Sequence, residues 1–175
     1  MRYTNATIET VDEEIRKTIR NRKVEKEGYA NSLSKGICLF GITGSGKTYT
    51  LYAIKNVLQA WGLKEEMSNI ENWVELLFEL KEKFSGNHGL KDTLHEITKN
   101  RYVFIDDIGA EKQTEWSQEM MYLIFNRVYQ KEGILFMTSN LTVDEFTQRY
   151  GDRIASRLAE MCDIKELPQE DKRLK

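Results

Sequence analysis

The chain has 175 residues, 26 basic and 28 acidic side chains for a formal net charge of −2, and a single proline, Pro168. This length fits one domain, and an apolar content of 40% is typical of a folded chain. No apolar stretch is long enough to span a membrane. The net charge of −2 also excludes a nucleic-acid binder that works by bulk positive charge. The polar start argues against a secretory signal, and two cysteines, Cys38 and Cys162, favour a reducing cytoplasmic location.

The first third of the chain is expected to form a helix, a strand and a second helix. A charge-rich helix is predicted at residues 11–27. The apolar run at residues 36–40 ends in glycine, which is typical of a short strand buried on both faces. In residues 47–61 apolar side chains recur every three or four positions, which predicts an amphipathic helix.

The pattern is weaker in the middle of the chain. It favours a short strand at residues 64–68 and a helix at residues 70–83, followed by a turn at 85–89 and a shorter helix at 91–98. Three large apolar residues of the longer helix are expected in the core: Trp73, Phe78 and Leu80.

Two further apolar strands are expected in the last part of the chain. Residues 102–105 end in two acids, and residues 134–137 lead into a Thr-Ser-Asn sequence. A helix at residues 114–131 separates them, with Gly133 as its cap. The remaining predicted elements are helices at 143–150 and 153–161 and a strand at 164–167. Strands that alternate with helices predict an α/β fold of three layers, α/β/α, around a mostly parallel sheet.

Residues 41–48 match the phosphate-binding pattern G-x-x-x-x-G-K-[ST] between a predicted strand and a predicted helix. Glycines let the backbone curl so that its N–H groups face an anion, and the helix N-terminus adds a positive dipole end. Lys47 is expected to reach the β- and γ-phosphates of ATP, and the Thr48 hydroxyl to bind Mg²⁺. The alternative is a glycine-rich turn without a ligand, which the order of strand, loop and helix disfavours. The expected nucleotide-binding residues are Gly41, Ile42, Thr43, Gly44, Ser45, Gly46, Lys47, Thr48 and Tyr49.

Polar side chains follow both later strands, and parallel strands deliver their carboxyl ends to one crevice. We expect Asp106 to hold Mg²⁺ opposite Thr48, and Asp107 to polarise the attacking water. Asn140 is expected to contact the γ-phosphate or to orient water. The alternatives are that the two acids cap a turn and that Asn140 caps the following helix.

Arg153 and Arg157 are four residues apart and therefore project from one helix face. An arginine supplied by a neighbouring subunit can stabilise the charge that develops during phosphoryl transfer. The alternative is a pair of surface arginines bonded to Asp152 or Glu160.

Together these segments resemble the DnaC/IstB group of AAA+ ATPases, which contains helicase loaders and transposition helpers. The similar stretches are residues 2–7, 41–48, 105–112, 138–141, 153–158 and, loosely, 171–173. The resemblance implies an AAA+ P-loop fold, Asp107 where most AAA+ proteins carry Glu, and Asn140 as sensor 1. It also implies an arginine finger, with Arg157 preferred to Arg153.

The resemblance implies two further contacts and a domain organisation. The opening segment is expected to lie against the adenine, and the insertion at residues 70–98 to help grip single-stranded DNA. We expect residues 1–175 to form a single AAA+ domain without a full C-terminal lid or a domain for gripping a helicase. Its parts are an N-terminal segment and linker at 1–34, an ATPase core at 35–167 and a tail at 168–175.

The expected function is that of a helicase-loader-like ATPase in DNA replication, which hydrolyses ATP weakly as a monomer and assembles as a homo-oligomer on single-stranded DNA. Its expected ligands are ATP or ADP and Mg²⁺, its partner a replicative helicase or a transposase, and no membrane is involved. A transposition helper and an ATP-gated binding module with little turnover remain alternatives, and a small-molecule kinase is disfavoured. His88 and His95 lack metal-ligand spacing, so no zinc role is expected.

Overall fold

The computed structural model describes residues 3–28, 35–85, 89–168 and 170–171. Five strands form one sheet in the order β2-β3-β4-β1-β5, and every neighbouring pair is parallel. The strands are β1 (Gly36–Phe40), β2 (Met67–Asn72), β3 (Tyr102–Ile108), β4 (Ile134–Ser139) and β5 (Cys162–Glu166). The predicted α/β class and parallel sheet are thereby confirmed.

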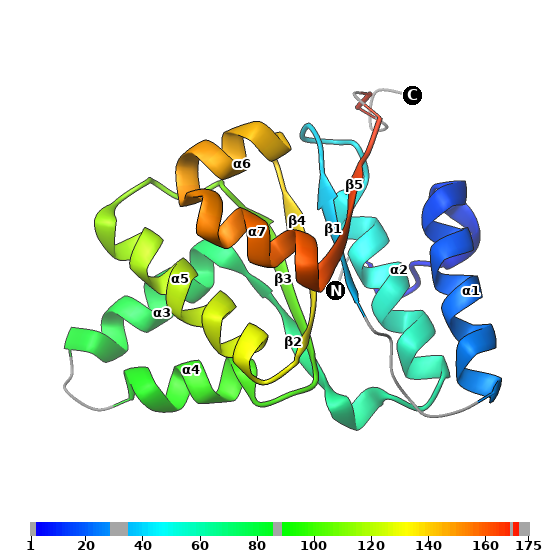
Figure 1. Ribbon diagram of the computed structural model, residues 1–175, viewed down its shortest axis with the longest axis horizontal. Coiled ribbons are helices and arrows are strands. Elements are labelled where there is room, and N and C mark those ends of the chain that lie inside the picture. The colour runs from blue at the N-terminus through cyan, green and yellow to red at the C-terminus, as the bar shows by residue number, and fades with distance from the viewer. Residues whose placement is uncertain (1–2, 29–34, 86–88, 169, 172–175) are drawn as a thin grey trace.

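Helices lie on both faces of this sheet (Figure 1). One face carries α1 (Glu13–Gly28) and α2 (Lys47–Ala60), together with the opening segment of the chain. The other face is covered by α3 (Trp73–Ser85), α4 (Leu90–Thr98), α5 (Glu115–Gln130), α6 (Val143–Tyr150) and α7 (Asp152–Met161). Short 3₁₀ turns occur at Ile8–Thr10 and Lys64–Glu66.

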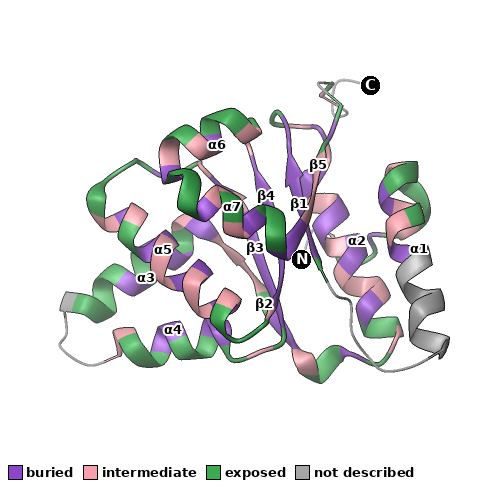
Figure 2. Ribbon diagram, in the orientation of Figure 1, coloured by how far each residue is buried: buried purple, intermediate pink, exposed green. Residues whose placement is uncertain are grey.

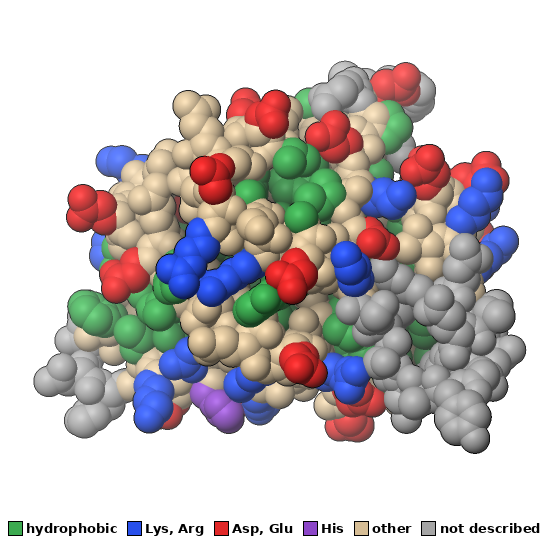
Figure 3. Space-filling model, in the orientation of Figure 1, with side chains coloured by type: hydrophobic (Ala, Val, Ile, Leu, Met, Phe, Trp, Pro, Cys, Tyr) green, Lys and Arg blue, Asp and Glu red, His purple; other side chains and the backbone are tan. Residues whose placement is uncertain are grey.

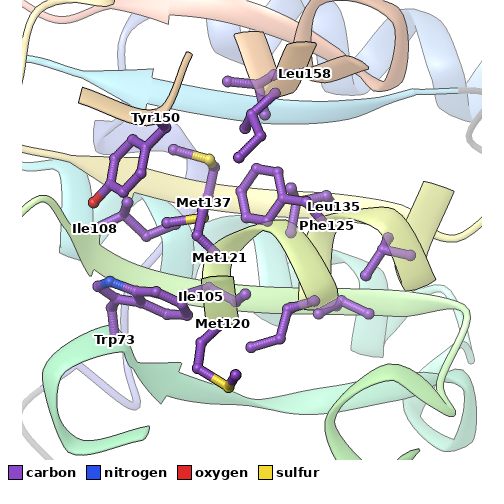
Figure 4. Close-up of a cluster of buried hydrophobic side chains, with 14 of the residues drawn as sticks. Trp73, Ile105, Ile108, Met120, Met121, Phe125, Leu135, Met137, Tyr150 and Leu158 are labelled. Carbon is purple, nitrogen blue, oxygen red and sulfur yellow. The ribbon is translucent and has the colours of Figure 1, made fainter. Parts of the chain in front are cut away.

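The alternation of side chains along the strands divides the core into two clusters. In β1, Ile37 and Leu39 pack beneath α2, whereas Cys38 and Phe40 belong to the cluster beneath α5. The central strands are buried along almost their whole length (Figure 2), as expected for a sheet covered on both faces. Figure 4 shows the second cluster, in which aromatic and methionine side chains fill the space between α5 and strands β3 and β4.

The boundary between β2 and α3 differs from the prediction. Ile70, expected in the helix, lies in β2, which pairs with β3. The helix begins only at Trp73, because the Asn72 side-chain oxygen accepts hydrogen bonds from the backbone N–H groups of Val74 and Glu75. Of the three residues expected in the core, Trp73 and Leu80 are fully buried, but Phe78 is 67% exposed.

The end of α5 also differs from the prediction. The left-handed residue there is Glu132, with φ 53°, and Gly133 follows it with its N–H bonded to the Val128 carbonyl.

Both cysteines are buried and free, and burial raises the pKa of the Cys38 thiol. Among the described helices, none has the length and apolar character needed to cross a membrane. Of the expected features, parts of the segment at 1–34, most of the turn at 85–89 with His88, and most of the tail at 168–175 fall outside the described residues.

Candidate functional site

The loop between β1 and α2 has the backbone shape of an anion-binding loop. Gly44 and Gly46 have φ values of 86° and 98°, a region that side chains with a Cβ rarely adopt. Gly46 directly precedes the first residue of α2, so the N-terminus of this helix points at the loop. A Cβ on Gly44 would also come within 2.0 Å of the Asp171 carboxylate, so the chain after β5 packs against the loop.

Lys47, the first residue of α2, folds back over this loop. Its Nζ donates hydrogen bonds to the carbonyl oxygens of Gly41, at 2.7 Å, and Ile42, at 2.8 Å. The side chain is only 6% exposed. The ammonium is therefore held where its charge faces any anion that enters the loop.

Asp106 lies at the centre of a small hydrogen-bonded group. Its Oδ1 accepts hydrogen bonds from the hydroxyls of Thr48, at 3.1 Å, and Thr138, at 2.5 Å. Burial raises the pKa of Asp106, and these two hydrogen bonds oppose that rise. A buried carboxylate beside a threonine hydroxyl is a suitable donor pair for Mg²⁺, which prefers oxygen ligands.

Asp107 and Asn140 meet across the ends of β3 and β4. The Asn140 side-chain N–H group donates to Asp107 Oδ1, and the Asp107 backbone N–H donates to the Thr138 hydroxyl at 2.8 Å. Asp107 has φ 64°, a left-handed conformation that Asp adopts more readily than most residues. The two side chains predicted to act on water are thus in direct contact.

A cavity of about 630 Å³ unites most of the predicted residues. It is lined by Tyr3, Thr10, Thr43, Gly44, Gly46, Lys47, Thr48, Tyr49, Thr50, Asp106, Asp107 and Asn140. Of the predicted nucleotide-binding residues, Gly41, Ile42 and Ser45 do not line it, and Ser45 is fully buried. Lys47 is the one basic residue among the described residues that line the cavity.

The opening segment of the chain lies along the same cavity. The Tyr49 hydroxyl accepts a hydrogen bond from the Thr7 backbone N–H at 3.1 Å and shares another with the Thr10 hydroxyl at 2.8 Å. The Tyr3 ring stands edge-on to the Tyr49 ring, with centroids 6.1 Å apart. Tyr49 therefore ties the opening segment to the helix that follows the loop.

Arg153 and Arg157 lie away from the cavity. Both project from α7 over the Tyr122 ring of α5, at 5.2 and 5.6 Å from its centroid, and Arg157 also lies 5.1 Å from the Tyr129 ring. Arg153 is exposed, whereas Arg157 is half-buried. Basic side chains gather on the surface where α7 crosses α5 (Figure 3). The structure thus keeps the two arginines together but does not bring them to the site of their own chain.

A buried ion pair that the sequence does not predict fixes the loop after β3. Arg149 lies 2.9 Å from the Glu111 carboxylate, and it also donates to the Gly109 and Glu111 carbonyl oxygens. Glu111 accepts further hydrogen bonds from the Gly109 N–H and the Tyr150 hydroxyl. Burial, together with the hydrogen bond to this carboxylate, raises the pKa of Tyr150. The partners are far apart in sequence, and the Glu-Lys sequence at 111–112 alone gives no signal for the pair.

Replacing Arg149 with Met is expected to lower the free energy of unfolding by about 3 kcal/mol, because it leaves the Glu111 carboxylate buried without its cation. Lys17→Met is the matched control, since Lys17 and Glu13 form an exposed ion pair on α1, for which we expect less than about 1 kcal/mol. Urea denaturation measures both values. Equal losses in the two variants would contradict the structural role of the buried pair.

Comparisons with known proteins show which proteins this chain is similar to. The family of IstB-like ATP binding proteins matches residues 4–175. The replicative helicase loader DnaI of Bacillus subtilis is 32% identical over 117 residues, which cover 66% of this chain and 36% of DnaI. The matched residues therefore span little more than a third of the length of that relative.

Two solved structures are similar in fold. A crystal structure of the DnaC helicase loader has a TM-score of 0.77 at 22% identity and covers 95% of this chain and 99% of its own. The replication initiator DnaA bound to AMPPCP and single-stranded DNA has a TM-score of 0.73 at 20% identity and covers 95% of this chain and 51% of its own. Because the family match extends over residues 4–175, this chain belongs to the family of IstB-like ATP binding proteins, and its fold is that of the DnaC helicase loader.

Proposed function

We propose that this chain binds ATP with Mg²⁺ and hydrolyses it as an assembly on single-stranded DNA, in the manner of a helicase loader in DNA replication. The observation that carries the proposal is that a lysine, the threonine after it, two acids and an amide line a single cavity beside the glycine loop. Its residues are Lys47, Thr48, Asp106, Asp107 and Asn140. We expect the protein to carry out this role in the cytoplasm. We also propose that the chain forms a single AAA+ domain, with an N-terminal segment and linker at 1–34, an ATPase core at 35–167 and a tail at 168–175.

Each residue has a distinct part in the proposed reaction. The loop N–H groups and Lys47 bind the β- and γ-phosphates, while Thr48 and Asp106 provide the protein ligands for the cation. When bound, Mg²⁺ neutralises charge on the phosphate oxygens. Asp107 accepts the proton of the attacking water, and Asn140 orients that water or the γ-phosphate.

Asp107→Asn is expected to reduce ATP turnover by about a hundredfold or more, because the amide cannot accept the proton, while ATP affinity stays within about threefold. Steady-state hydrolysis and equilibrium binding measure the two effects separately. Asp144→Asn is the matched control, since it removes the same charge from an exposed position on α6. Wild-type turnover in Asp107→Asn would exclude Asp107 as the base.

The excess of negative charge in the cavity supports the proposal that a neighbouring subunit supplies an arginine to it. Lys47 faces two carboxylates there, and ATP adds several negative charges. We propose Arg157 as this finger, because the Tyr122 and Tyr129 rings hold its guanidinium in one direction, with Arg153 as the second candidate. Each site is then completed only when a second copy of the chain docks against it.

Hydrolysis measured with and without single-stranded DNA tests the DNA part of the proposal. We expect single-stranded DNA to raise turnover per subunit, because it gathers the subunits that complete one another's sites. Double-stranded DNA of the same length is the control. ATP binding without turnover, even at high concentration with single-stranded DNA, would instead support an ATP-gated binding module.

The family match favours a second candidate function, an IstB-like helper ATPase in transposition. The chemistry at the cavity is the same in both cases, and the two differ in the protein partner. Pull-down with a purified replicative helicase and with a purified transposase distinguishes them. Binding to the transposase alone would replace the replication role.

A further inference from the structure

The irregularity in β3 lets two consecutive acids face the same cavity. In a regular strand, successive side chains point to opposite faces. Asp106 and Asp107 nevertheless both line the cavity. Something in β3 must therefore interrupt the alternation at this point.

The pairing of β3 with β4 shows where the interruption lies. Ile105 is opposite Met137 and Ile108 is opposite Ser139, so Asp106 and Asp107 together face the single residue Thr138. Two residues opposite one is the arrangement of a β-bulge. Ile105 and Ile108 accordingly lie in the same core cluster although they are three positions apart (Figure 4).

The Thr138 side chain takes over the hydrogen bonding inside this bulge. Its hydroxyl accepts the Asp107 backbone N–H at 2.8 Å and donates to Asp106 Oδ1 at 2.5 Å. The residue is 1% exposed, so water cannot readily replace either bond. One hydroxyl thus holds the backbone of one acid and the carboxylate of the other.

We propose that Thr138 is a positioning residue, whose hydroxyl holds the β3 bulge so that Asp106 and Asp107 face the nucleotide together. It acts through the two acids and does not itself line the cavity. Its role in orienting bound Mg²⁺ and water rests on the proposed ATPase function. Its role in holding the bulge does not depend on that function, and the two roles are measured separately.

The first measurement uses the protein without nucleotide. In Thr138→Val the shape of the side chain is kept and the hydroxyl is lost, so the Asp107 amide proton should exchange with solvent about tenfold faster by NMR. Thr138→Ser should keep the wild-type rate. Thr98→Val is the matched control, because Thr98 is equally buried and its hydroxyl donates to Leu94 in the distant helix α4.

The second measurement compares the affinity for a fluorescent ADP analogue with and without Mg²⁺. Thr138→Val should lose most of the gain in affinity that Mg²⁺ provides, while its affinity without Mg²⁺ stays within about twofold of wild type. Thr138→Ser and Thr98→Val should both keep the gain. If the wild-type protein bound no nucleotide, the proposed function would fail while the exchange measurement still tested the bulge.

Three results would overturn the proposal. They are a wild-type exchange rate at Asp107 in Thr138→Val, equally fast exchange in Thr138→Ser, and an equal change at Asp107 in Thr98→Val. If Thr138→Val does not fold, Thr138→Ala compared with Thr138→Ser makes the same comparison between a missing and a retained hydroxyl.

Discussion

Lys47→Met is expected to weaken ATP binding about hundredfold, which corresponds to about 2.7 kcal/mol. In the proposed site the ammonium provides the positive charge for the phosphates, and it also donates hydrogen bonds to the Gly41 and Ile42 carbonyl oxygens. Its loss therefore removes an attractive charge and loosens the loop at the same time. Isothermal titration calorimetry measures the affinity.

The same helix offers a matched control for this prediction. Lys55 is also on α2 and also donates to a backbone carbonyl, that of Ser68 at 2.7 Å, but it does not line the cavity. Lys55→Met should therefore keep the wild-type affinity for ATP. A loss of affinity in Lys55→Met as large as in Lys47→Met would show a general effect on α2 and contradict a phosphate-binding role of Lys47.

Arg157→Ala is expected to reduce ATP turnover about a thousandfold while leaving ATP affinity within about threefold. The residue lies outside the cavity of its own chain, so its effect on turnover must pass through a neighbour. Arg153→Ala, one helical turn away, should have a smaller effect. The reverse order would assign the finger to Arg153.

Mixing two inactive variants separates a finger supplied by a neighbour from one acting within its own chain. Arg157→Ala has an intact phosphate loop, and Lys47→Met has an intact arginine. When they assemble together, the Lys47→Met subunit should supply Arg157 to the site of its neighbour and restore part of the turnover. No recovery at concentrations at which the wild type is fully active would contradict this arrangement.

The central part of the fold could be predicted because its signals are local. Strands β1, β3 and β4 are apolar runs that end in glycine or polar residues, and the loop at residues 41–48 carries its own pattern. The boundary of β2 could not be predicted in this way. Its sequence, MSNIEN, is mostly polar, as an edge strand permits, and its one strongly apolar residue, Ile70, fits the helical spacing that follows.

The same distinction applies to the site. The phosphate-loop pattern predicted Lys47 and Thr48, and residue type at strand ends predicted Asp106, Asp107 and Asn140. All five line one cavity. The bulge in β3 depends on its register with β4, and the Arg149–Glu111 pair joins residues 38 positions apart. Features that arise from tertiary pairing leave no periodicity in a single sequence.

Turnover per subunit as a function of protein concentration tests the central claim most directly, namely that a cavity lined by one lysine becomes an ATPase site when a neighbour adds an arginine. We predict that turnover per subunit rises with concentration and reaches a plateau as subunits assemble, and that Arg157→Ala removes the rise. Turnover per subunit that is independent of concentration, and unchanged in Arg157→Ala and Arg153→Ala, would contradict this account.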